Sequence, residues 1–294
     1  MKRFFSIFLG LFVLISLPAM AQKPVYNIEN VTGDLYRFQS NNHYGVFLVT
    51  KEGIILADPI NTATATWLKG ELDTRFGVPV KYVIYSHDHA DHTSGGEVFE
   101  DTATFVAQAY ALKKFQESGH TPVPQRLVLT NDVLELGGAE VDLFYYWNSH
   151  TDNLLTIYFP KEKAVFLVDA VGVKRLPYRD LASTNVNNTI FYLSEVKNLD
   201  FDILIPGHGS IGGPKDLDDH LNYLGALSHG VTRGLELGHN LETIKEDVAL
   251  DDFKDWAMFE EWRELNIEGA YRQKFEKKSQ PAKENYPVRI KYKN

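Results

Sequence analysis

The stretch "YSHDHADHTSGG", residues 85–96, decides how this sequence is interpreted. It continues the apolar run "VKYVIY", residues 80–85, which is typical of a buried strand. Three histidines and two aspartates lie within the six positions 87–92, with Ala90 as the sixth residue. Ligand sites of α/β proteins gather at the carboxyl ends of strands, so we expect a functional site here. A solvated polar loop is the alternative, but so dense a cluster favours metal binding.

The spacing within this stretch suggests two metal positions. His87 and His89 can converge on one ion, whereas Asp91 and His92, further along the loop, can face a second ion beside it. The chain contains no cysteine, which excludes disulfides and thiolate ligands. Any metal must therefore be bound through nitrogen and oxygen.

The first 21 residues predict a cleaved signal peptide. Basic Lys2 and Arg3 precede an apolar stretch, residues 4–17, and the small-residue site "AMA" ends at Ala21. A retained membrane anchor is the alternative, but the apolar run is short for a membrane span. We therefore expect a periplasmic or secreted protein that begins at Gln22 and has no stable membrane anchor.

The composition describes a globular, acidic chain. Its 294 residues are 44% hydrophobic, which is ample for a core and excludes overall disorder. The net charge is −9, and loss of Lys2 and Arg3 makes it more negative by two. Nucleic acid is therefore not an expected partner, and a small-molecule substrate is.

The pattern along the chain alternates strands and helices. Four short strand-like runs with turn residues between them predict hairpins before residue 58, and helical spacing follows at 62–76. A second half is expected to repeat this plan. Its predicted elements are strands near 126–130, 133–136, 140–146, 153–159 and 164–168, a helix at 189–198, and the buried run "FDILIP" at 201–206; a further helix is expected at 108–118.

After Gly213 the alternation of strands and helices gives way to long helical segments, and helices are expected at 215–238 and 240–249. We predict a signal peptide at 1–21, an α/β domain at 22–238 and a helical C-terminal extension at 239–294. An apolar stripe in the extension is expected to form a core or helix–helix contact; it comprises Phe259, Trp262, Leu265 and Ile267. Whether the chain is a monomer or a homodimer is left open.

On its motifs the sequence resembles the metallo-β-lactamase superfamily, whose signature His-x-His-x-Asp-His stands here at residues 87–92. Three further residues match the family's ligands, and each follows a predicted strand: His150 in "NSHTDN", Asp169 at the end of "AVFLVDA" and His208 in "IPGHGS". Taken singly, His150 could be a turn residue, Asp169 a helix cap and His208 an ordinary residue of a glycine-containing turn. The combination is specific, and it covers about residues 25–235.

The resemblance implies a four-layer αββα sandwich with two zinc ions, or other divalent metals, at one edge. One zinc would take His87, His89 and His150, and the second would take Asp91, His92 and His208. Asp169 would bridge them, as in the glyoxalase II and lactonase branches. The best-known β-lactamase branches carry a cysteine at that position, so this chain departs from them.

The expected activity is that of an exported zinc-dependent hydrolase. A metal-bound hydroxide would open a cyclic amide or ester, such as a β-lactam or lactone, or cleave a thioester. Asp91 would orient the hydroxide and carry a proton to the leaving group. Asp58, in "LADP", would fix a ligand imidazole or simply cap a strand. The rival hypotheses are a mononuclear iron enzyme of the sulfur dioxygenase type and a metal-binding protein without turnover.

The long loop "AVGVKRLPYRDLASTNVNN", residues 170–188, is expected to form a wall of the substrate pocket. Its polar side chains could steer a substrate carboxylate, or belong to a solvated loop; they are Lys174, Arg175, Tyr178 and Arg179. The sequence does not identify the substrate. The remaining histidines lack ligand spacing and are assigned surface or packing roles: His43, in a hairpin that overhangs the site, and His120, His220, His229 and His239.

Overall fold

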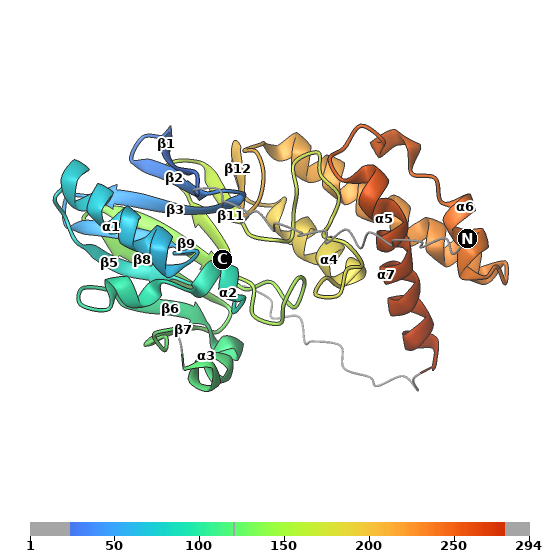
Figure 1. The fold of residues 1–294 in the computed structure, drawn as a ribbon, viewed down its shortest axis with the longest axis horizontal. Coiled ribbons are helices and arrows are strands. Elements are labelled where there is room, and N and C mark those ends of the chain that lie inside the picture. The colour runs from blue at the N-terminus through green and yellow to red at the C-terminus, as the bar shows by residue number, and fades with distance from the viewer. Residues whose placement is uncertain (1–23, 120, 280–294) are drawn as a thin grey trace, which may run out of the picture.

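The structure is a computed structural model that describes residues 24–119 and 121–279. Within these residues the strands form a seven-stranded and a five-stranded sheet (Figure 1). The first sheet contains, in order, β1 (Tyr26–Thr32), β2 (Leu35–Ser40), β3 (His43–Thr50), β4 (Gly53–Ala57), β5 (Val80–Ile84), β6 (Thr104–Gln108) and β7 (Arg126–Val128). The second contains β8 (Asn131–Leu136), β9 (Ala139–Phe144), β10 (Thr156–Phe159), β11 (Ala164–Leu167) and β12 (Ile203–Pro206).

Seven α-helices complete the described part of the chain. They are α1 (Thr62–Arg75), α2 (Ala90–Thr93), α3 (Leu112–Ser118), α4 (Val186–Val196), α5 (Pro214–Glu236), α6 (Leu241–Asp247) and α7 (Phe259–Ser279). Local signals set their ends. Asn61 caps α1 by accepting a hydrogen bond from Thr64 N, and Pro214 occupies the first turn of α5, where its missing N–H costs nothing.

Two hydrophobic cores separate the layers. One lies between the first sheet and the helices α1 and α3, with Leu68 and Phe115 among its buried members. The other fills the space between the two sheets and continues to α4 and α5, with Val46, Phe166 and Leu224 inside it. The order of layers is therefore helices, sheet, sheet, helices. The expected αββα sandwich is confirmed.

The N-terminal hairpins are confirmed, because β1 to β4 pair antiparallel in succession. One strand differs from the sequence interpretation. The segment near 126–130 was assigned to the second half, but β7 pairs in parallel with β6, with Val106 opposite Arg126, at the edge of the first sheet. The crossover through α3 returns the chain to that sheet, since parallel strands need such a connection. The predicted helix at 108–118 contains a 3₁₀ turn, Ala109–Ala111, before α3.

The C-terminal segment packs on the rest of the chain. Trp262 and Ile267 of α7 are buried in the same core as Leu224 of α5, as the apolar stripe predicted. The boundary proposed at residue 238 stays a prediction. The predicted signal peptide and His120 lie outside the described residues. None of the described helices combines the length and apolar character needed to cross a membrane.

Candidate metal centre

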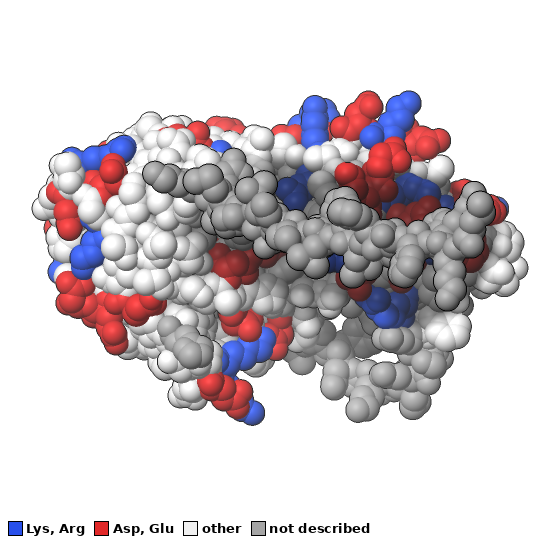
Figure 2. All heavy atoms as spheres, viewed as in Figure 1, with Lys and Arg blue, Asp and Glu red and all other residues white. Residues whose placement is uncertain are grey.

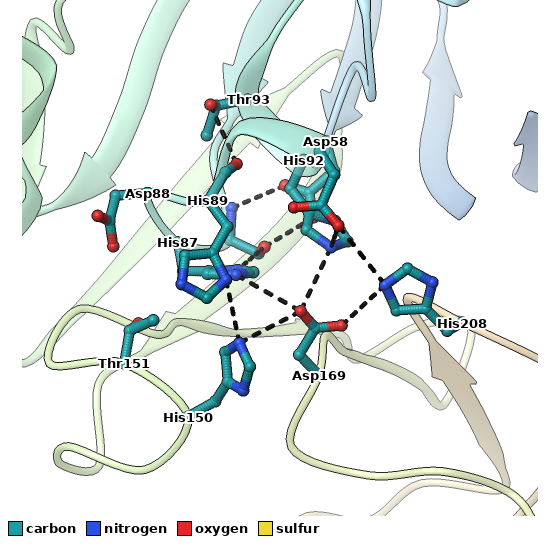
Figure 3. A network of polar contacts seen from close by, with 12 residues as sticks. Asp58, His87, Asp88, His89, His92, Thr93, His150, Thr151, Asp169 and His208 are labelled. Atoms are coloured by element: carbon teal, nitrogen blue, oxygen red, sulfur yellow. Dashed lines mark hydrogen bonds and ion pairs between the residues drawn. The ribbon is translucent and has the colours of Figure 1, made fainter. Parts of the chain in front are cut away.

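The structure brings the seven expected metal ligands together at one edge of the sandwich. Figure 3 shows the five histidines and Asp169. The motif at 87–92 follows β5, His150 lies in the loop between β9 and β10, and Asp169 and His208 follow β11 and β12. Strand ends from both sheets therefore supply one cluster. Segments that lie more than a hundred residues apart in the sequence meet there.

Hydrogen bonds lock the motif loop to the loop that carries His150. Leu155 N donates to Ser86 O at 2.8 Å. Asp88 and Asn153 bond reciprocally: Asp88 N donates to Asn153 Oδ1 at 3.0 Å, and Asn153 Nδ2 donates to Asp88 Oδ1 at 2.6 Å. Because Asn153 is buried, these bonds are shielded from water. These bonds join the two loops directly.

The first ligand group comprises His87, His89, His150 and Asp169. His150 Nε2 lies 3.1 Å from His89 Nδ1 and 3.3 Å from Asp169 Oδ2, and His87 Nε2 lies 3.6 Å from the same oxygen. Ligand atoms around a tetrahedral zinc ion with bonds of 2.0–2.1 Å are about 3.3 Å apart. The spacing therefore suits one such ion.

A second group shares Asp169 with the first and comprises His92, Asp169 and His208. His208 Nε2 lies 3.1 Å from Asp169 Oδ1, and His92 Nε2 lies 3.5 Å from Asp169 Oδ2. Asp91 lies nearby, with its Oδ2 3.6 Å from His92 Nε2 and 3.9 Å from His208 Nε2. Asp169 is thus the one carboxylate that touches both groups, as a bridging ligand must.

Outer hydrogen bonds leave the inward nitrogen of several imidazoles free for a metal. His208 Nδ1 donates to Asn42 O at 2.9 Å, so in the neutral ring its Nε2 keeps a lone pair. His150 Nδ1 contacts Thr184 Oγ1 at 3.2 Å in the same way. Metal-binding histidines use their second nitrogen in this manner to fix ring orientation and tautomer.

Asp58 and Ser86 contact the outward nitrogens of two further imidazoles, those of His92 and His87. Asp58 is fully buried and accepts from Ser86 N at 2.8 Å and from Ser86 Oγ at 2.7 Å. Since the Ser86 hydroxyl proton is used on Asp58, its oxygen can accept from His87 Nδ1, 3.0 Å away. Asp58 Oδ2 also lies 3.1 Å from His92 Nδ1. Asp58 therefore touches one expected ligand directly and another through Ser86.

The charges of the cluster are strongly coupled. Burial lowers the pKa of His87 well below its ordinary value and that of His150 to about 4. Burial also opposes the charge of His92, but Asp169 and Asp58 together raise its pKa well above the usual range. For Asp169 the burial effect is likewise outweighed, and the surrounding imidazoles hold its pKa well below normal. The buried Asp169 carboxylate is therefore ionised, and positive charge beside it is stabilising.

The donor set fits divalent ions. His87 Nε2 and His92 Nε2 are buried and have no hydrogen-bond partner among the described residues, which would be costly if nothing bound them. Both point at the shared Asp169. Nitrogen and carboxylate ligands with no sulfur suit zinc and other first-row metals. The residues present thus fit the two-metal centre that the sequence predicts.

A cavity of about 560 Å³ opens from the cluster, and α5 and α7 help to line it. Of the four predicted substrate-contacting residues, Arg175 and Tyr178 line this cavity together with Trp262. The Arg175 guanidinium lies 5.0 Å from the Trp262 ring centre, and the Tyr178 ring meets Trp262 edge-on at 5.2 Å. The other two, Lys174 and Arg179, do not line the cavity. The Arg179 guanidinium lies over the Tyr178 ring, and the carbonyl of Lys174 accepts a hydrogen bond from Ala257 N.

Sequence reasoning missed three residues at the site. Ser86 supports His87, and only its place next to the motif could have indicated that. His43 lies 3.4 Å from Asp91 Oδ2 through its Nε2, although it was assigned a surface or packing role. His220 lines the cavity as a buried imidazole. His229 and His239 lie elsewhere on α5 and beyond it.

Comparison with known proteins agrees with this arrangement. Residues 65–208 match the model of the metallo-beta-lactamase superfamily. The chain is 24% identical over 204 residues to the 2,4-dinitroanisole O-demethylase subunit alpha of Nocardioides sp.. This alignment covers 65% of this chain and 60% of that protein. It is 25% identical to the metallo-beta-lactamase type 2 of Elizabethkingia meningoseptica over 57% of this chain and 71% of that enzyme.

A solved structure shares the fold. The metallo-beta-lactamase from Pontibacter korlensis superposes with a TM-score of 0.62 at 19% identity, over 68% of this chain and 99% of that one. The matched family region contains every expected ligand from His87 to His208. The matching motif, the shared fold and the convergence of the ligands at the same edge agree, and the chain belongs to the metallo-β-lactamase superfamily.

Proposed function

We propose that this chain is an exported zinc-dependent hydrolase that opens a cyclic amide or ester, or cleaves a thioester. The observation that carries the proposal is the pair of ligand groups that share Asp169. A mononuclear iron enzyme, the rival hypothesis, would need only one such group. Because the chain spans only 60% of the demethylase subunit, that relative does not identify the substrate.

Two divalent ions in these groups would acidify a water molecule and polarise the substrate carbonyl. The chain's own residues would do the remaining work. Asp91 is half-exposed at the cavity, where water and a substrate can reach its carboxylate. An ionised carboxylate there can accept a proton from water and return it to the leaving group.

The cavity supports a small substrate that carries an anionic group. Among the described residues, no carboxylate pairs with the Arg175 guanidinium, so it is available to a substrate carboxylate. Trp262 and Tyr178 offer apolar surface beside it. Figure 2 shows acidic and basic side chains mixed on the visible face, which supports a small molecule rather than nucleic acid as the partner.

The test is a panel of lactam, lactone and thioester substrates, assayed with protein purified without added metal. We expect turnover that a chelator abolishes and zinc restores, and zinc near two ions per chain. In Arg175→Ala the KM for carboxylate-bearing substrates should rise about tenfold or more, while the neighbouring variant Lys174→Ala serves as the matched control. Iron as the dominant metal, with no hydrolysis across the panel, would contradict the proposal.

Export is proposed on the sequence of residues 1–21 alone. Mass analysis of the N-terminus of exported protein tests it, and the expected first residue is Gln22. Exported protein that still begins at Met1 would contradict this part of the proposal.

A further inference from the structure

We propose that His43 is a metal ligand, which acts with Asp91 and His208 to hold the second ion on the side facing the cavity. The inference rests on the proposed metal centre and extends its ligand set beyond the seven residues of the sequence motifs. The ligand atoms of these three residues lie within 4.8 Å of one another. His43 begins β3, far upstream of the motif, so no motif spacing marks it.

The backbone on either side of His43 is tied to the loop that carries His208. Asn42 O accepts the hydrogen bond from His208 Nδ1 at 2.9 Å, and Tyr44 N donates to Gly207 O at 3.0 Å. These two bonds bracket His43 on the strand. They fix the hairpin against the site, so the position of the imidazole is set by the fold rather than by a loose loop.

Glycine at position 207 permits this close approach. A Cβ there would lie 2.7 Å from Val168 Cγ1 and 3.2 Å from His92 Cε1. A side chain at this position would therefore force either Val168 or the loop that carries His208 to shift. The same backbone contact positions His208 and His43 together.

The distance between His43 and Asp91 is that of two ligands on one ion. His43 Nε2 lies 3.4 Å from Asp91 Oδ2. A charge-assisted hydrogen bond between nitrogen and carboxylate would draw the atoms to about 2.7–2.9 Å. Neighbouring ligand atoms on a tetrahedral ion with bonds of 2.0–2.1 Å are about 3.3 Å apart. The contact thus matches shared coordination better than a direct bond.

The ring geometry repeats that of the first ligand group. His43 and His208 meet edge to face with ring centres 4.7 Å apart at 72°. His87 and His89 meet at 4.5 Å and 69°, and His89 and His150 at 4.8 Å and 80°. Imidazoles that converge on one point adopt this arrangement on both sides of Asp169. The side chain of His43 is 35% exposed and lines the cavity, so an ion held there would face the substrate.

Cadmium NMR of the full chain tests the assignment directly. The protein is loaded with ¹¹³Cd, and proton–cadmium correlation spectra detect the ring protons of each histidine bound to the metal. We expect correlations from six imidazoles: the five of the motif set and His43. In His43→Phe, which keeps an aromatic ring against His208, the His43 correlations should vanish while those of His87, His89 and His150 remain.

The control is His239→Phe. His239 also contacts a carboxylate, because its Nδ1 lies 2.8 Å from Asp247 Oδ2, but it belongs to neither ligand group. This variant should leave the spectrum unchanged. Correlations from the other site histidines without any from His43 would overturn this inference and leave the proposed function standing. A spectrum with no histidine correlations at all would overturn both.

Discussion

The two sides of the centre are built differently. The inner group is His87, His89, His150 and Asp169, and the outer group is His43, Asp91 and His208. His208 also belongs, with the buried His92, to the group that shares Asp169, so this carboxylate joins the two sides. The side chains of His87, His150 and Asp169 are 0%, 9% and 11% exposed, whereas those of the outer group are 28–48% exposed. The inner group is buried in the sandwich. The outer group stands at the mouth of the cavity.

We infer from this difference that the inner group mainly fixes a metal ion and that the outer group mainly faces the substrate. Ser86, Asp58 and Asn153 fix the inner loops through buried hydrogen bonds, so an ion there meets ligands already in place. The outer group depends on a hairpin tip and a glycine loop, and it faces the space a substrate would enter. We infer that the inner ion is bound more tightly and that the outer one is closer to the chemistry.

The largest expected effect comes from removing the residue that both sides share. Asp169→Ala should reduce the metal content from two ions to one and lower turnover by more than about 10⁴-fold, because two close cations would lose their bridging charge. Mass spectrometry of the native protein measures the metal content. Asp142→Ala, which removes a half-buried carboxylate from β9, is the matched control and should keep both ions.

Asp91→Asn is expected to act on the outer side alone. The amide retains an oxygen for the metal but cannot carry a proton, so turnover at saturating zinc should stay about 10²–10⁴-fold low. The deficit should be larger for a lactam than for a thioester, because a thiolate scarcely needs protonation on leaving. Full rescue by zinc would show that Asp91 serves only as a ligand.

Ser86→Ala should weaken the inner side without removing a ligand. Loss of the hydroxyl leaves His87 Nδ1 without its partner, which should lower the affinity of the inner ion about 10–100-fold. Titration of zinc against a chromophoric chelator measures this. Ser94→Ala, in the same segment, provides the control. An unchanged affinity would mean that Ser86 does not support the inner group.

The smallest effect concerns His220, a buried imidazole in the cavity that belongs to neither group. Burial lowers its pKa to about 4, and its Nδ1 accepts a hydrogen bond from Gly172 N. In the unfolded chain the same imidazole has its ordinary pKa of about 6.5, so it is protonated there at a higher pH than in the folded chain. The free energy of unfolding should therefore fall by about 3 kcal/mol as the pH drops from 6.5 to 4.

In His220→Gln this part of the pH dependence should disappear. Urea unfolding of metal-free protein at several pH values, with His229→Gln as the exposed control on the same helix, measures the difference. Equal slopes for wild type and His220→Gln between pH 6.5 and 4 would contradict the prediction.

Local sequence patterns predicted most of the cluster on both sides. Dense histidine and aspartate spacing after a strand placed His87 and His89, and apolar runs that end at Asp169 and before His208 brought those residues to the same edge. The layer order followed from the alternation of strands and helices. These features are local, or follow from the rule that strand ends share an edge.

The place of His43 in the outer group depends on contacts that no local pattern records. His43 reaches the centre only because Asn42 and Tyr44 bond to the loop after β12. The partner of β7 was likewise misassigned, since a short strand at 126–128 can join either sheet and long-range packing decides between them. The contribution of Trp262 to the cavity required α7 to fold back on α5.

Stepwise binding of zinc to the metal-free chain tests the central claim most directly. Competition with a chelator of known affinity gives both the number of ions and their separate affinities. A two-metal centre with unequal sides predicts two ions per chain, with the weaker affinity being the one that changes in Asp91→Ala. Binding of a single ion per wild-type chain would contradict the account.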